Sequence, residues 1–198
     1  MKRVSKIQTV DTDTNAGGVG MSTFTVVTSQ SVIDWTAFKT GGQHHGTLQF
    51  KSGTVEVDPD DKRPVGGVFY FDMNSINDLD QEGKLKELLE SDLKGSKFFD
   101  VTDYPEAKLE LIKVDHTPDI NGAYGVNAAL TMKGIRNELT FKAKYSVLPD
   151  GGISVQTDVI VVDRIKWGIT EGSKNIFKKL VDHIIADNFD VKATLVAR

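Results

Sequence analysis

A chain of 198 residues is long enough for one all-β barrel or sandwich domain with a sizeable core. It contains no cysteine, which excludes disulfide bonds, a thiolate nucleophile and cysteine metal ligands. The formal net charge of −4 with interspersed signs argues against a nucleic-acid partner, and no apolar run approaches the roughly 20 residues that span a bilayer.

The N-terminal segment differs in composition from the rest. Residues 1–20 are rich in Thr, Asp, Asn and Gly, which predicts a flexible tail, and 21–198 predict a single domain without linkers or repeats. Lys2 and Arg3 are not followed by an apolar stretch, so no signal peptide is predicted. Either the protein is cytoplasmic or its export signal is missing from this chain.

The main signal in the domain is a period of two in hydrophobicity. Apolar residues alternate with polar ones at 47–51, 68–73, 108–111, 139–147 and 189–197. This alternation predicts strands with one face on an apolar interior and the other in water. Breaks at 58–60, 117–122 and 149–152 separate the runs, and the last two predict hairpin connections. We therefore expect an all-β domain, built as an antiparallel barrel or sandwich.

One helix interrupts the strands. Its apolar stripe at helical spacing consists of Leu85, Leu88, Leu89 and Leu93. Asp80 is the expected N-cap and Gly95 the expected end. A helix of this kind typically covers one end of a barrel. A shorter second cover is predicted at 174–181, where Ile176, Phe177, Leu180 and Val181 come together.

The inward-facing positions of four strands suggest a hollow interior. The same-face sets are Tyr124, Val126, Ala128, Leu130 and Met132; Leu139, Phe141, Ala143, Tyr145 and Val147; Ile153, Val155, Thr157, Val159 and Val161; and Phe189, Val191, Ala193, Leu195 and Ala197. The third residue of each set is small. If the strands align in register, these small residues open an apolar cavity midway along the barrel. The alternative is that small and large residues alternate to fill a tapering interior.

No recognisable catalytic or metal site is present in the sequence. His44 and His45 are adjacent, and neighbours in a strand point to opposite faces, so they cannot both bind one metal ion. His116 and His183 lie in separate segments without an acidic residue at ligand spacing. There is no Gly-x-Ser-x-Gly elbow. We therefore predict no catalytic residues and no metal site, and a structural or ligand-polar role for one of the histidines.

The most distinctive short run is Asp-Arg-Ile-Lys-Trp-Gly at 163–168. Arg164 either closes the barrel through a buried ion pair with a carboxylate or meets a polar or phosphate headgroup. The structural role is the favoured one.

Several loose motifs, taken in order, resemble the YceI-like family. They occur at 35–39, 42–47, 71–76, 93–101, 104–107, 130–135, 163–168 and 195–197. Together they span about 24–198. One departure is Arg136, where the family pattern leads us to expect a small hydroxyl residue.

The resemblance implies an extended, lipocalin-like antiparallel β-barrel of about eight strands, with one or two short covering helices. It also implies non-catalytic binding of a polyisoprenoid, an isoprenoid quinone or a polyprenyl phosphate, with no cofactor besides such a lipid. Family members are typically exported to the periplasm and linked to stress responses or to lipid transport and storage. The resemblance therefore predicts a periplasmic or secreted protein, although this chain shows no export signal.

The resemblance and the inward positions together suggest a lipid site. The expected tunnel wall comprises Trp35, Phe38, Phe50, Phe69, Phe71, Leu109, Tyr124, Val126, Ala128, Leu130, Phe141, Ala143 and Tyr145. His44, His45 and Arg164 are expected near the headgroup.

Three other hypotheses stay open at this point. The cargo is a fatty acid or an amidated lipid; the protein is a lipid-modifying enzyme that uses a barrel histidine with a nearby carboxylate; or it is a structural domain with a filled barrel. The sequence also leaves open whether the chain forms a homodimer.

Overall fold

A computed structural model describes residues 20–176 and 184–198. Residues 1–19 of the predicted tail at 1–20, and most of the predicted second helix at 174–181, lie outside the described residues. The strands are β1 (Ser22–Thr25), β2 (Val32–Lys39), β3 (Gly42–Val57), β4 (Pro64–Asp78), β5 (Glu106–Val114), β6 (Tyr124–Met132), β7 (Ile135–Val147), β8 (Ile153–Thr157), β9 (Ile160–Asp163) and β10 (Ile185–Ala197). The helices are α1 (Gly83–Lys94) and the 3₁₀ turns η1 (Thr28–Gln30) and η2 (Arg164–Trp167).

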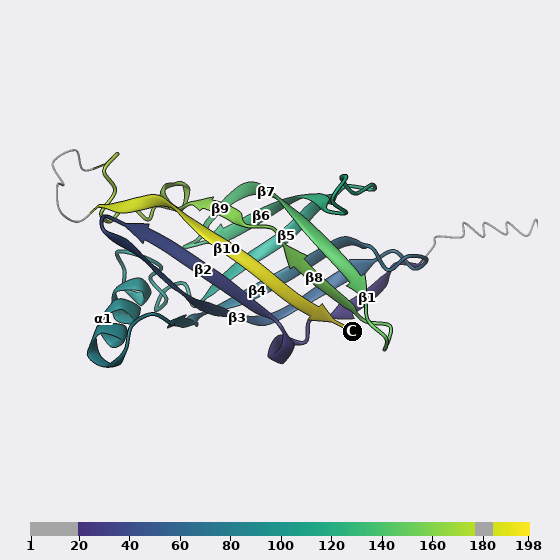
Figure 1. Cartoon of the computed structure of the whole chain (residues 1–198), viewed down its shortest axis with the longest axis horizontal. Coiled ribbons are helices and arrows are strands. Elements are labelled where there is room, and N and C mark those ends of the chain that lie inside the picture. The colour runs from purple at the N-terminus through teal and green to yellow at the C-terminus, as the bar shows by residue number, and fades with distance from the viewer. Residues whose placement is uncertain (1–19, 177–183) are drawn as a thin grey trace, which may run out of the picture.

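The strands form a closed antiparallel barrel (Figure 1). Around the barrel the order is β3-β2-β10-β8-β7-β6-β5-β4, and pairing of β4 with β3 closes it. β8 and β9 follow one another along the same side and both pair with β10. This gives eight strand positions and confirms the predicted all-β barrel of about eight strands.

The barrel is elongated because several strands are long. β3 has 16 residues and β4 has 15, and at about 3.3 Å per residue such strands extend for roughly 50 Å. In Figure 1 the long axis is horizontal, and the strands run obliquely along it. The helix α1 lies at one end of the barrel. The two predicted hairpins are present, connecting β5 with β6 and β7 with β8. The hairpin that contains Arg136 turns through Lys133 and Gly134, which both have positive φ as a type I′ turn requires.

The alternation of β4 is a good example of how the sequence produces the wall. Phe69, Phe71 and Met73 are buried, whereas the residues between them are less so. The prediction for the strand after β8 is wrong, however. Val159 and Val161 are exposed, and Ile160 and Val162 point inward instead. The strand breaks after Thr157, and one extra residue outside the ladder exchanges the two faces.

The predicted helix is present as α1 and ends at Gly95 as expected. The prediction that Asp80 is its N-cap is wrong, because the N-cap position is Glu82 and no side chain caps the helix. The apolar stripe is only half buried: Leu89 and Leu93 line the interior, but Leu85 and Leu88 are 64% and 53% exposed. The helix thus covers the barrel end with its C-terminal half.

Polar contacts hold α1 against the end of β4. The Asp78 backbone N–H donates to Glu90 Oε1 at 3.0 Å, and Lys86 Nζ donates to the Asp78 carbonyl at 2.7 Å. Lys86 and Lys94 lie 3.7 and 3.5 Å from the Glu90 carboxylate, one helical turn away on either side. These contacts connect the covering helix to the strand end that precedes it.

Gly46 is required by the indole of Trp35. The two residues are direct partners between β2 and β3, and a Cβ at position 46 would lie 2.5 Å from Trp35 Cζ2 and would overlap the Asn77 carbonyl oxygen. We expect Gly46→Ala to lower the free energy of unfolding by about 1–3 kcal/mol through overpacking, measured by urea denaturation.

Gly42→Ala is the matched control on the same strand, because a Cβ there meets nothing within 4 Å. It should change stability by no more than about 0.5 kcal/mol. Equal stability of the two variants would contradict the close approach of the indole to β3.

Candidate functional site

The barrel encloses a cavity of about 1000 Å³. Its volume lies at the upper end of the range for small-molecule sites. Most of the wall is aliphatic or aromatic, including Ile33, Trp35, Leu48, Phe50, Phe69, Phe71, Met73, Leu109, Leu111, Val126, Leu130, Leu139, Phe141, Val155, Val191 and Leu195. The side chains of residues 20–176 and 184–198 therefore leave the interior hollow.

Small side chains from three adjacent strands lie together in the cavity wall. Ala143 of β7 pairs with Thr157 of β8, and the Ala193 backbone N–H of β10 donates to Thr157 Oγ1 at 2.9 Å. All three residues line the cavity. Ala128 does not join them, because β6 is offset so that Tyr124 pairs with Ala143 and Ala128 pairs with Leu139. The predicted alignment of four small residues is thus correct for three of them.

Aromatic rings form much of the central wall. The Phe50 ring contacts those of Phe69 and Phe71 edge to face, with centroids 6.2 and 5.3 Å apart. The Trp35 indole N–H donates to the Thr47 carbonyl at 3.1 Å, so its polar atom is satisfied. The rings therefore present hydrocarbon surface to the cavity.

The cavity extends toward both ends of the barrel. Toward α1 its wall includes Thr40, His44 and Asn188, and toward the β3–β4 turn it includes Arg63 and Tyr145. His44 lies near the start of β3 and Arg63 follows its end, so these two groups are at opposite ends of a 16-residue strand. The site is an apolar tunnel with polar groups at each end.

The end near the β3–β4 turn carries a buried arginine that the sequence analysis did not single out. Arg63 is 7% exposed, with Nη2 3.8 Å from Asp58 Oδ2 and Nε 3.7 Å from Asp61 Oδ2. Burial raises the pKa of nearby Tyr145 to about 12, so this phenol is neutral at ordinary pH. Nothing in a short acidic turn indicates that its arginine is directed inward.

The structure brings together almost all of the predicted tunnel residues. Every member of the predicted wall set lines the cavity except Ala128, which is fully buried beneath its neighbours. Residues missed include Met73, which continues the alternation of β4, and Ile76, which is buried three residues later, after the period of two has broken. Phe98 and Phe99 were also missed, because they follow α1 and have no strand period. That the wall residues contact a lipid stays a prediction.

The two adjacent histidines differ in position. His44 lines the cavity, and its Nδ1 lies 2.8 Å from Asp80 Oδ2. His45 does not line the cavity, and half of its side chain is exposed. The opposite facing of strand neighbours explains the difference. Of the two, His44 is the one that can meet a ligand in the tunnel.

Arg164 has its donors occupied by the backbone. Its Nε, Nη1 and Nη2 donate to the carbonyls of Ala186, Ile169 and Ile185 at 2.9, 2.7 and 3.1 Å. The side chain is 4% exposed, and Nη2 is 3.9 Å from Asp187 Oδ1. These contacts fit the structural role better than headgroup binding, which stays untested.

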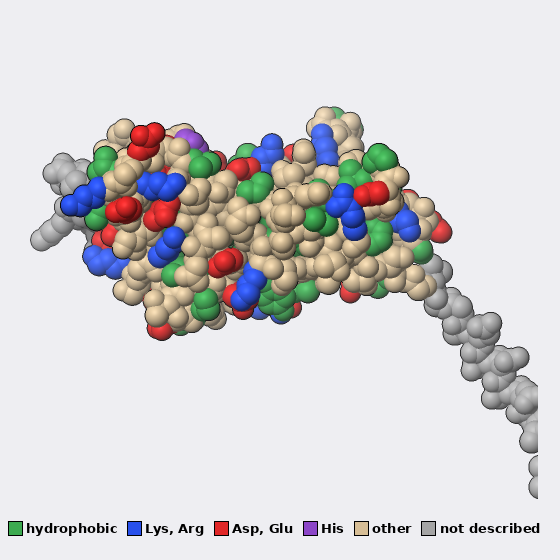
Figure 2. Space-filling model, turned by 90° about the horizontal axis from the view of Figure 1, so that it is seen from below, with side chains coloured by type: hydrophobic (Ala, Val, Ile, Leu, Met, Phe, Trp, Pro, Cys, Tyr) green, Lys and Arg blue, Asp and Glu red, His purple; other side chains and the backbone are tan. Residues whose placement is uncertain are grey.

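The outer surface carries mixed charge. Figure 2 shows one face of the barrel, on which acidic and basic side chains are interspersed and do not form a patch of one sign. Within residues 20–176 and 184–198, no helix has the length and hydrophobicity needed to cross a bilayer.

Comparison with known proteins agrees with this architecture. The family model described as the YceI-like domain matches residues 24–197. Among solved structures, Burkholderia cenocepacia BcnA is similar, with 20% identity, a TM-score of 0.67, and coverage of 87% of this chain and 99% of that one. A domain from Saccharophagus degradans, described as polyisoprenoid binding and implicated in plant cell wall breakdown, has 14% identity, a TM-score of 0.57, and coverage of 88% and 97%. No curated protein matches. Since the family model spans nearly all of the barrel, this chain belongs to the YceI-like domain family.

Proposed function

We propose that this protein binds one long-chain apolar lipid in the barrel tunnel and so transports or stores it without catalysis. The lipid is a polyisoprenoid, such as an isoprenoid quinone or a polyprenyl phosphate. The observation that carries the proposal is the cavity of about 1000 Å³ with its hydrocarbon wall. The description of the Saccharophagus degradans domain as polyisoprenoid binding supports it.

The driving force is desolvation of the hydrocarbon chain. Each buried methylene contributes about 0.8 kcal/mol, so a chain of several isoprene units gains far more than the cost of its lost freedom. Hydrocarbon side chains make up most of the wall, and a polar headgroup would lie at one tunnel end, near His44 or near Arg63. The small side chains of Ala143, Thr157 and Ala193 leave room in the wall for the methyl branches of a prenyl chain.

The test is a titration of detergent-free protein followed by tryptophan fluorescence. Trp35 lines the tunnel, whereas Trp167, the other tryptophan, is buried outside the wall. We expect a polyprenol to bind with one site per chain and to shift the Trp35 emission. A Trp35→Phe variant should lose the shift. If the protein bound an unbranched fatty acid or its amide more tightly than the polyprenol, the result would contradict the polyisoprenoid proposal and favour the alternative cargo.

The enzyme alternative has a separate test at His44, whose contact with Asp80 resembles an acid–base pair. Turnover of a bound lipid that disappears in His44→Ala, with lipid binding retained, would overturn the non-catalytic proposal. The location in the periplasm or outside the cell remains a prediction from the family resemblance.

A further inference from the structure

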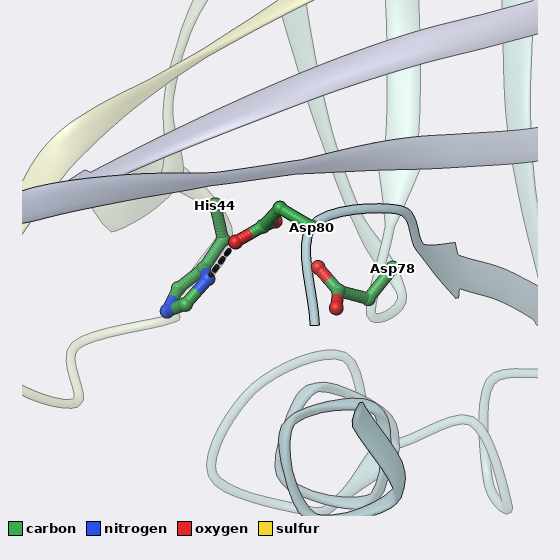
Figure 3. Close-up of side chains that lie close together, drawn as sticks. All are labelled: His44, Asp78 and Asp80. Atoms are coloured by element: carbon green, nitrogen blue, oxygen red, sulfur yellow. Dashed lines mark hydrogen bonds and ion pairs between the residues drawn. The ribbon is translucent and has the colours of Figure 1, made fainter. Parts of the chain in front are cut away.

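Three potential metal ligands meet at the α1 end of the barrel (Figure 3). His44 comes from β3, Asp78 from the last position of β4, and Asp80 from the turn that follows. One ligand atom from each side chain lies within 4.8 Å of the other two. Figure 3 shows the Asp80 carboxylate meeting the imidazole of His44, with the Asp78 carboxylate on the other side of the turn.

The backbone around the cluster is fixed by hydrogen bonds between the strands and the turn. Gly46 of β3 pairs with Asp78, and the Leu79 N–H donates to the His45 carbonyl at 2.9 Å. The His45 N–H donates to Asp80 Oδ1 at 2.8 Å, and the Gln81 N–H donates to Asp78 Oδ2 at 2.8 Å. The ligand atoms are therefore held on a preorganised scaffold.

Asp78 supplies an independent sign of a missing partner. It is completely buried, and among the described residues no donor reaches its Oδ1. Burial, and then the neighbouring Asp80 carboxyl, raise the pKa of Asp78 above its usual value. Burial also acts to raise the pKa of Asp80, but hydrogen bonds from the His45 N–H, Gln81 and His44 outweigh it and leave that pKa well below the usual range. In geometric terms, a fully buried carboxylate oxygen without a donor among the described residues lies beside a second carboxylate and an imidazole, and this arrangement leaves a place for a cation.

The nearby lysines do not supply that cation. Lys86 Nζ donates to Asn77 Oδ1 and to the Asp78 backbone carbonyl, not to its carboxylate. Lys39 Nζ lies 2.7 Å from His44 Nε2, on the side of the ring away from Asp80. In the part of the chain that the structure describes, the side chains paired with the Asp80 carboxylate are His44, His45 and Gln81, and no ion pair reaches Asp78.

We propose that His44 Nδ1 and one carboxylate oxygen each from Asp78 and Asp80 bind a divalent cation of the Zn²⁺ class. One imidazole and two carboxylates are ligands that Zn²⁺ accepts, and three protein ligands leave a position open for water. The cation lies between the two carboxylates and satisfies Asp78 Oδ1. It also takes the lone pair of His44 Nδ1, so the imidazole proton moves to Nε2 and the exposed Lys39 ammonium turns to solvent. The site rests on this cluster alone and does not require a bound lipid.

The test uses isothermal titration of ZnCl₂ into the full chain, without a histidine tag, after treatment with EDTA and dialysis. We expect one Zn²⁺ per chain and a rise in Tm on adding Zn²⁺. His44→Ala and Asp78→Asn should each weaken binding at least about tenfold and abolish the rise in Tm. Asp78→Asn keeps the side-chain shape, and circular dichroism checks that both variants are folded.

His45→Ala is the matched control, since it removes an adjacent exposed histidine outside the cluster. It should bind Zn²⁺ as the parent does. Absence of binding would overturn the proposal and assign a shared proton to the two aspartates. Binding that His44→Ala and Asp78→Asn leave unchanged would overturn it equally, because the metal would then be held elsewhere on the surface.

Discussion

Replacement of Ala143 by Phe is expected to abolish uptake of a polyprenol while leaving the barrel folded. Ala143 lines the cavity beside Thr157, and both lie in the part of the wall where the side chains are small. A phenyl ring at this position extends into empty space and occupies the volume that the lipid chain requires. Little overpacking follows, because no packed side chain has to move. Fluorescence titration measures uptake, and urea denaturation measures the free energy of unfolding.

Ala128→Phe is the matched comparison on the neighbouring strand. Ala128 is fully buried, does not line the cavity, and has Leu111 and Leu139 as its partners on the two adjacent strands. A ring there displaces packed side chains and should lower the free energy of unfolding by about 1–3 kcal/mol. If Ala143→Phe lost as much stability as Ala128→Phe, the interior near Ala143 would be packed and not hollow.

Replacement of Arg164 by Met is expected to lower the free energy of unfolding by about 3–5 kcal/mol. The guanidinium binds three carbonyls, on the segment after η2 and at the start of β10, and Met leaves these buried acceptors without donors. Lipid affinity of the molecules that remain folded should stay the same, because the donors already have protein partners. Urea denaturation and polyprenyl phosphate titration measure the two quantities.

Lys166→Met in the same 3₁₀ turn serves as the control, since Lys166 is exposed. Its stability should change by no more than about 0.5 kcal/mol. Unchanged stability of Arg164→Met together with weaker binding of polyprenyl phosphate would instead assign Arg164 to the headgroup.

The barrel wall was predictable because alternation along a strand depends only on the local sequence. Phe69, Phe71 and Met73 are buried, and Phe141 and Ala143 line the tunnel, where the period of two expects them. The period fails where the chain leaves the ladder. The break after Thr157 reverses the inward face, and no residue type in that segment marks it in advance.

The arrangement between strands was less predictable, because register depends on pairing and not on composition. Ala128 is offset from Ala143 by the pairing of β6 with β7. The cluster of His44, Asp78 and Asp80 joins residues more than 30 positions apart through the β3–β4 ladder, whose register shifts are invisible in the sequence. Adjacent histidines drew attention to His44, but nothing local connected it with the two aspartates.

The partial exposure of the apolar stripe of α1 was also not predictable, because it depends on how the helix packs against the barrel and not on local sequence. Helical spacing correctly groups Leu85, Leu88, Leu89 and Leu93 on one side. How much of that side is covered depends on where the helix meets the barrel, and only the leucines of its C-terminal half line the interior. The exposure of Leu85 and Leu88 is thus a tertiary property.

Mass spectrometry of the protein, purified from its native host without detergent, addresses the lipid-carrier proposal most directly. Native spectra give the mass of any non-covalent adduct, and organic extraction identifies its chemical class. We predict one polyisoprenoid per chain, lost from Ala143→Phe and retained by His45→Ala. Protein that emerges without lipid and takes up neither a polyprenol nor an isoprenoid quinone would contradict the proposed function.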